Sequence, residues 1–138
     1  MKLKIGKNEF NIEFAFKPTL KARVLSKLAR IEQGLKNDDG AAEMEVIEDL
    51  LMFLPELLLA GLQKHHEDYR YNYDTEDGKE EQLDKTFDLI EEYSESENAS
   101  YIQLFQDMEE EMLQNSFLKR VFQEEQKKAQ EKAKKTES

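Results

Sequence analysis

An apolar run in the middle of the chain, Leu50–Leu62, limits the available folds more than any other segment. It is 13 residues long and contains Pro55 and Glu56, whereas a helix needs about 20 apolar residues to cross a bilayer. We therefore expect no membrane span. The second half of the run has no polar face, because its leucines stand at Leu57, Leu58, Leu59 and Leu62. Such a helix is either the best-buried helix of a domain or a partner surface, and burial in the core is the favoured interpretation.

Helical spacing begins before this run. The positions that form one helical stripe are Met44, Ile47, Leu50, Leu51 and Leu54. Proline is tolerated in the first turn of a helix and disfavours helix at the residue before it. We therefore expect either two helices, at about 41–54 and 55–66, or one helix with a kink at Pro55. A polar turn at 36–40 precedes them.

The start of the chain, residues 1–16, predicts a β-hairpin. Leu3 and Ile5 alternate with lysines, and a second alternating series follows at Phe10, Ile12, Phe14 and Phe16. Residues 6–8, Gly-Lys-Asn, supply the turn. An isolated hairpin is marginal in water, so its apolar face must pack on helices or on another chain.

One amphipathic helix is expected after the hairpin. Pro18 suits its first turn and Gly34 its end. Its apolar stripe comprises Leu20, Val24, Leu28 and Ile31.

The second half of the chain predicts three more helices. Residues 67–78 are polar, aromatic and turn-rich, and are expected to form an excursion between the two helical halves. Helices at about 79–93 and 101–114 follow, the second with its inward positions at Leu104, Phe105, Met108 and Met112. Asn115-Ser116 can end this helix and cap a last one. That helix carries Phe117, Leu118, Val121 and Phe122.

These elements together predict a mainly α member of the α+β class, with an N-terminal hairpin packed on a bundle of about five helices. Residues 1–122 are expected to form a single domain. Residues 123–138 contain no large apolar side chain, so they cannot bury enough surface to offset the entropy of ordering. We expect them to be a charged tail, either helical or disordered.

Charge is distributed unevenly along the chain. Residues 1–36 carry nine basic and three acidic side chains (+6), residues 37–118 four and 24 (−20), and residues 119–138 seven and four (+3), for a net charge of −11. The acidic middle repels phosphate backbones, so we expect no nucleic-acid binding. An acidic middle and basic ends also favour head-to-tail self-association.

Little in the sequence points to chemistry. Cysteine is absent, which excludes disulfides, thiolate catalysis and cysteine-bearing metal sites. The only histidines, His65 and His66, point about 100° apart on a helix and do not readily share a metal. The acidic clusters Glu109–Glu111 and Glu91-Glu92 predict solvated faces, and no phosphate-binding glycine loop or GxSxG motif is present. We expect no enzymatic activity, no metal and no cofactor.

Three segments together resemble the tail assembly chaperones of long-tailed bacteriophages that infect Gram-positive bacteria. They are the opening hairpin of residues 1–16 with the helix directly after it, the stretch TFDLIEEY at 86–93, and LFQDMEEEM at 104–112 running into NSFL at 115–118. The resemblance covers most of residues 1–122. It implies a non-enzymatic protein that coats the aggregation-prone tape measure protein before the tail tube polymerises around it. Such proteins are absent from the finished virion and commonly also exist as a longer, frameshifted form that recruits tube protein.

The expected partners are therefore the tape measure protein, the tail tube protein and further copies of this chain, in the cytoplasm of the bacterial host. The start of the chain also lacks an apolar signal core, in keeping with that location. The candidate partner-binding residues are Leu57, Leu58, Leu62, Leu118, Val121 and Phe122. Two alternatives remain: an acidic DNA mimic that blocks a DNA-binding enzyme, and a small enzyme whose site is assembled from scattered residues.

Overall fold

A computed structural model describes residues 1–36 and 40–136. Strands β1 (Lys2–Ile5) and β2 (Asn8–Asn11) pair in antiparallel register, with Leu3 opposite Phe10. Gly6 occupies the tight turn between them at a φ of 61°, a conformation that other residues adopt with strain. The predicted hairpin is confirmed, and its buried face packs on the helices.

The alternating pattern after β2 does not all belong to the hairpin. Ile12 and Phe14 are buried as expected, but Phe16 is 64 % exposed. The reason is that Phe16 is the first residue of helix α1 (Phe16–Lys21), where the two-residue alternation of a strand no longer applies.

The single helix expected over residues 18–34 is wrong, because the chain forms two. Helix α2 (Val24–Leu35) follows α1 after a break at Arg23, whose φ is 54°. Pro18 and Thr19 are the buried residues of α1, whereas Leu20 is exposed. The remaining stripe positions, Val24, Leu28 and Ile31, do face the core. Gly34 does not end α2, and its lack of a side chain allows Val46 to approach closely.

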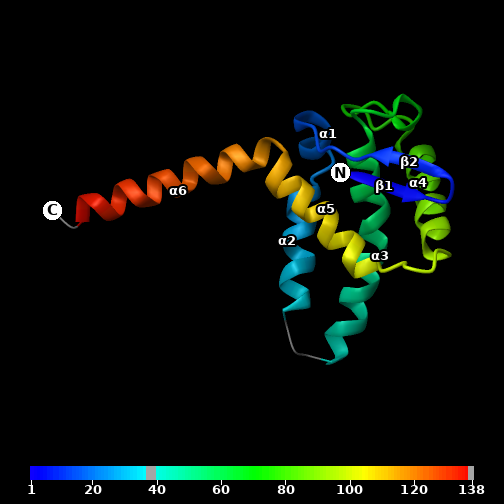
Figure 1. Ribbon diagram of the computed structural model, residues 1–138, viewed down its shortest axis with the longest axis horizontal. Helices are drawn as coiled ribbons and strands as arrows, with labels where there is room; N and C mark the ends of the chain where they lie inside the picture. Colours follow the sequence, from blue (N-terminus) through cyan, green and yellow to red (C-terminus); the bar gives the residue numbers. More distant parts are fainter. Residues whose placement is uncertain (37–39, 137–138) are drawn as a thin grey trace.

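The apolar run lies in one continuous helix, α3 (Gly40–Leu62), with Pro55 inside it. The structure therefore has one helix here, and not two separate helices that meet at Pro55. Its second half is buried on all sides, since the side chains exposed by 2 % or less include Leu54, Leu57, Leu58, Leu59 and Leu62. Helices α2 and α4 (Lys79–Ser94) and the hairpin surround it, and α5 (Tyr101–Asn115) crosses in front of it (Figure 1). The core interpretation of this run is confirmed. The turn predicted at 36–40 falls on residues 37–39, which lie outside the described residues.

The later helices match their expected positions. A 3₁₀ turn, η1 (Glu67–Tyr69), opens the polar excursion, and α4 (Lys79–Ser94) and α5 (Tyr101–Asn115) follow. All four inward positions predicted for α5 are buried. The Ser116 hydroxyl accepts a hydrogen bond of 3.1 Å from the amide of Leu118, so Ser116 caps α6 (Phe117–Thr136).

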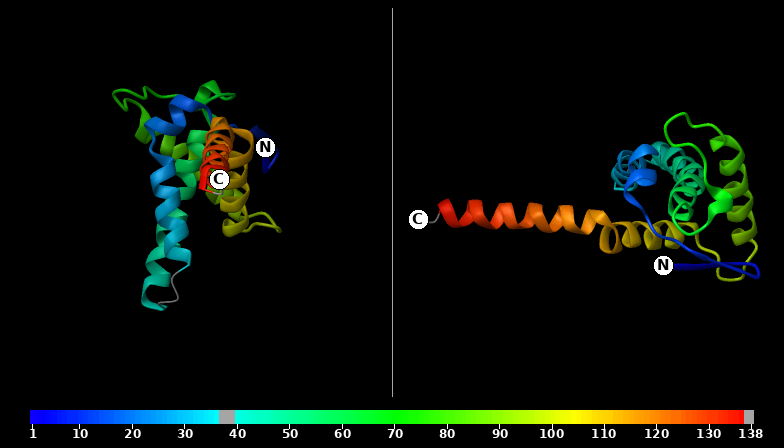
Figure 2. Two further views of the ribbon diagram at one scale, coloured as in Figure 1. Left: turned by 90° about the vertical axis from the view of Figure 1, so that its left-hand side faces the viewer. Right: turned by 90° about the horizontal axis from the view of Figure 1, so that it is seen from above.

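Two elements project from the compact body (Figures 1 and 2). The first is the arm, formed by the lower part of α2 and the first half of α3. The second is α6, which extends away from the body and from the arm. Residues 123–133 are exposed, so this part of the tail is solvated, and the helix continues to Thr136. Over the residues that the structure describes, no helix has the length and apolar character that a membrane span requires.

Candidate binding surfaces

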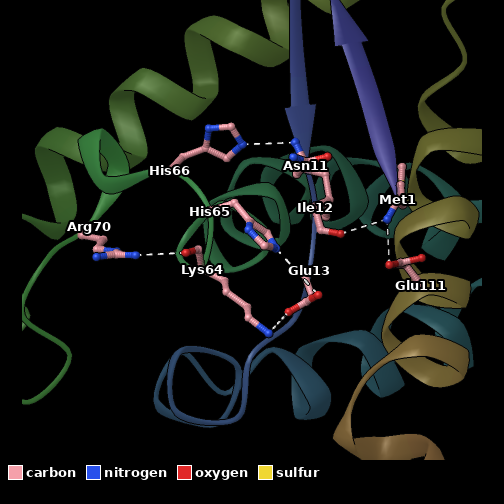
Figure 3. Close-up of polar contacts among 9 residues, drawn as sticks. All are labelled: Met1, Asn11, Ile12, Glu13, Lys64, His65, His66, Arg70 and Glu111. Carbon is pink, nitrogen blue, oxygen red and sulfur yellow. Dashed lines mark hydrogen bonds and ion pairs between the residues drawn. The ribbon is translucent and has the colours of Figure 1, made fainter.

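A polar cluster joins the hairpin to the end of α3 (Figure 3). The Glu13 carboxylate pairs with Lys64, and His65 Nε2 lies 3.7 Å from Glu13 Oε1. The hydrogen bond from Lys64 holds the pKa of Glu13 below its ordinary value, against an opposing effect of burial. The Glu13 amide also donates to the carbonyl of Gly61, where a side chain would collide with Ile12. The cluster therefore fastens the segment after β2 to α3.

His66 makes a separate contact. Its Nε2 accepts a 3.1 Å hydrogen bond from the amide of Asn11, and its ring lies 5.4 Å from that of Phe10. The expectation that both histidines stand on a helix is therefore wrong, because α3 ends at Leu62 and the chain turns His66 towards β2. Among the described residues, no three His, Asp or Glu side chains come close enough together to hold a metal ion.

Two of the three glutamates expected to form a solvated face on α5 instead contact residues of other segments. The Glu111 side chain is 12 % exposed and accepts a 2.7 Å hydrogen bond from the Met1 amino group, which also donates to the carbonyl of Ile12 (Figure 3). Glu109 lies beside Glu32 of α2. Burial, followed by the hydrogen bond and repulsion from Glu32, raises the pKa of Glu109 to about 7. Only Glu110 is exposed as expected, because α5 packs on α3 with Glu109 turned towards Glu32 and Glu111 towards Met1.

The tyrosine-rich segment after α3 is held by several contacts to the body. The Tyr73 hydroxyl donates to Gln63 Oε1 at 2.9 Å, and Arg70 donates to the carbonyls of Gln63 and Lys64. Burial is the main reason that the pKa of Tyr71 rises to about 12. These hydrogen bonds hold the segment against the C-terminal end of α3, which it covers.

An uncovered apolar stripe runs along the arm. Met44, Ile47 and Leu51 lie on one side of α3, and Met44 is 72 % exposed. The sequence stripe placed these residues with the buried Leu50 and Leu54. The difference arises because the first half of α3 projects from the body, where α2 covers only one of its sides (Figure 1). We call Met44, Ile47 and Leu51 the arm stripe.

A second uncovered apolar surface lies where α6 leaves the body. Val121 and Phe122 are 46 % and 48 % exposed, and we call this pair the α6 patch. Leu118, one turn earlier, is buried, and Phe117 packs edge-on against Phe16 with ring centroids 5.0 Å apart.

The structure thus divides the predicted partner-binding residues. Leu57, Leu58 and Leu62 are fully buried and Leu118 nearly so, so a partner cannot touch their side chains in this conformation. The physical reason is that α3 lies at the centre of the bundle. Only Val121 and Phe122 remain accessible. The arm stripe was missed, although a signal was present: its turn of α3 carries Glu45, Glu48 and Asp49, a density of charge typical of a solvated helix.

Comparison with known proteins adds no constraint, because no family model, curated protein or solved structure matches the chain.

Proposed function

We propose that this protein is a non-enzymatic tail assembly chaperone of a long-tailed bacteriophage, which coats the tape measure protein in the host cytoplasm and promotes tail tube assembly. The observation that carries the proposal is a small body with two uncovered apolar surfaces on projecting elements. Exposed apolar patches are typical of sites that bind other proteins. A long helical client offers many such contacts at once, and several weak contacts on one client combine to hold it strongly.

The α6 patch is the proposed client surface. Val121 and Phe122 are the only members of the predicted partner-binding set that reach solvent. They lie between Lys119-Arg120 and Glu124-Glu125, which gives the client an apolar surface edged by charges of both signs.

Client holding can be tested by co-expression with an otherwise insoluble tape measure protein. The Val121→Ser/Phe122→Ser variant is expected to lose most of the soluble client, because it removes the apolar contact without touching the core. Ile102→Ser is the matched control, since Ile102 is also an exposed apolar residue but lies on α5. If the α6 variant keeps the client soluble as well as the parent does, the α6 patch is not the client surface.

One observation supports the DNA-mimic alternative. The exposed face of α4 carries a row of acids at helical spacing, Glu80, Asp84, Asp88, Glu91 and Glu95 at its end. Carboxylates so spaced can imitate phosphates for a DNA-binding partner. Neutralising Glu80, Asp84 and Asp88 to their amides distinguishes the two functions. A chaperone acting through α6 keeps its client-holding activity, whereas a DNA mimic loses its inhibition of the partner enzyme.

A further inference from the structure

The junction between α1 and α2 leaves the start of α2 without a cap. Arg23 occupies the N-cap position in a left-handed conformation, and its side chain makes no capping hydrogen bond. The amide of Lys27 donates to the carbonyl of Arg23, so the amides of Leu25 and Ser26 come before the first bond of the helix. Within the described part of the chain, these two amides have no acceptor. Unpaired amides and the helix dipole together make such a helix end attractive to an anion.

A pocket of about 230 Å³ lies at this helix end, where α1 meets α2 (Figure 1). We call it the junction pocket. Its lining residues, none of them acidic, are Thr19, Leu20, Arg23, Leu25 and Ser26. Pockets for drug-sized ligands begin at about 300 Å³. The junction pocket is smaller, so its size suits one small polar group.

A buried hydroxyl in the junction pocket lacks a partner. Thr19 is fully buried, and its Oγ1 makes no hydrogen bond to any part of the chain that the structure describes. Buried polar groups are nearly always hydrogen-bonded, so an unpaired one calls for an explanation. Threonine has two common rotamers in a helix, which allows its hydroxyl to turn towards a ligand. Because Thr19 lines the junction pocket, a hydrogen-bond acceptor bound there would supply the missing partner.

Positive charge gathers around the same junction. Residues 14–31 contain five basic side chains and no acidic one, in a chain with 31 acidic residues. Lys17, Lys21 and Lys27 pair with carboxylates of other segments. Arg23 is exposed, lines the junction pocket and makes no ion pair with any described residue. A guanidinium group matches the geometry of phosphate oxygens, to which it donates two parallel hydrogen bonds.

We propose that the junction pocket binds a phosphate group. The amides of Leu25 and Ser26 donate to it from the helix end, and the Thr19 hydroxyl and the Arg23 guanidinium supply the other donors. A phosphate group has more oxygens than a carboxylate and can therefore accept from all four residues at once. The phosphate is either the free ion or the end of a larger molecule. This site is separate from the α6 patch and does not depend on the proposed function.

A nuclear magnetic resonance titration of the isotope-labelled full chain tests the site. Sodium phosphate is added at pH 7, and sodium chloride at the same ionic strength is the reference. We expect the amide resonances of Leu25 and Ser26 to shift saturably with phosphate alone. The dissociation constant should be millimolar, because only a few hydrogen bonds form and they are open to water. Glycerol 3-phosphate distinguishes the two sources: tighter binding than inorganic phosphate indicates a phosphate carried on a larger molecule, and weaker binding indicates the free ion.

Two variants test the proposed donors. Thr19→Val replaces the hydroxyl by a methyl group, and Arg23→Asn removes the charge with a residue that tolerates the left-handed conformation. Each should weaken phosphate binding about tenfold or more, since each removes a hydrogen bond to a charged group. Arg30→Gln is the matched control, because Arg30 is another exposed cation of α2 without an ion pair to the described residues. It should bind phosphate within about twofold of the parent, as expected for a side chain outside the site.

Thermal stability without phosphate separates binding from a structural role. Thr19→Val should not lower the melting temperature, because it removes a buried hydroxyl that has no partner. Circular dichroism checks the fold of each variant, and Arg23→Asn keeps the test decisive if Thr19→Val fails to fold. Equal shifts with phosphate and chloride would show ionic screening only and would overturn the proposal. A folded Thr19→Val or Arg23→Asn variant that binds phosphate as tightly as the parent would overturn it as well.

Discussion

At the scale of single residues, the burial of a carboxyl group gives a pH-dependent prediction. The pKa of Glu109 is about 7 in the folded chain, against 4.5 for an ordinary glutamate. The Glu109 carboxyl group therefore loses its proton at a lower pH in the unfolded chain than in the folded chain. As a result, the free energy of unfolding falls as pH rises from about 4.5 to 7, and the contribution of this group is constant above that range. Glu109→Gln retains the uncharged form at every pH. Because Glu109 is only half-buried, solvent screening limits the gain in the free energy of unfolding to about 1 kcal/mol or less, or about 2–4 °C in melting temperature.

The measurement is the thermal midpoint at pH 8 and at pH 5.5. The gain from Glu109→Gln should be larger at pH 8. Glu110→Gln is the control, because Glu110 is the exposed neighbour, and it should show no such difference. Equal gains at both pH values would contradict the raised pKa.

A second prediction at this scale uses two phenylalanines that are two positions apart. Phe14 is fully buried and Phe16 is exposed. Phe14→Asp leaves an unpaired charge in the core and should cost several kcal/mol. Phe16→Asp loses only the edge contact with Phe117, or about 1.5 kcal/mol at most. Urea denaturation of both variants measures the difference, and similar losses would show that Phe14 is not part of the core.

At the scale of elements, the free part of α6 is expected to contribute little to stability. Residues 123–133 are exposed, so deletion of residues 124–138 is expected to remove no core contact. The melting temperature should change by less than about 2 °C. A deletion that begins at Phe117 serves as the comparison, since it also removes the buried Leu118, and it should lower the melting temperature markedly. A large loss for the shorter deletion would show that the tail packs on the body.

At the scale of the whole molecule, the two projecting elements determine how the chain meets other proteins. The body buries the residues with the strongest apolar pattern, and the arm and α6 expose weaker ones. The strong apolar pattern of Leu57, Leu58 and Leu62 therefore predicted partner contacts at the residues least able to make them.

Local patterns were sufficient for the hairpin, for α4 and α5, for the cap at Ser116 and for burial of the leucine-rich half of α3. Each of these depends on periodicity, turn residues or capping chemistry, which short segments carry within themselves. The break at Arg23, the exposure of Met44 and the raised pKa of Glu109 were not predictable in this way. They depend on which helix lies beside which, and the same periodic stripe is buried or exposed according to whether another element covers it. Coverage is a property of the packed molecule, so it was established only when α2, α4, α5 and the hairpin took their places around α3.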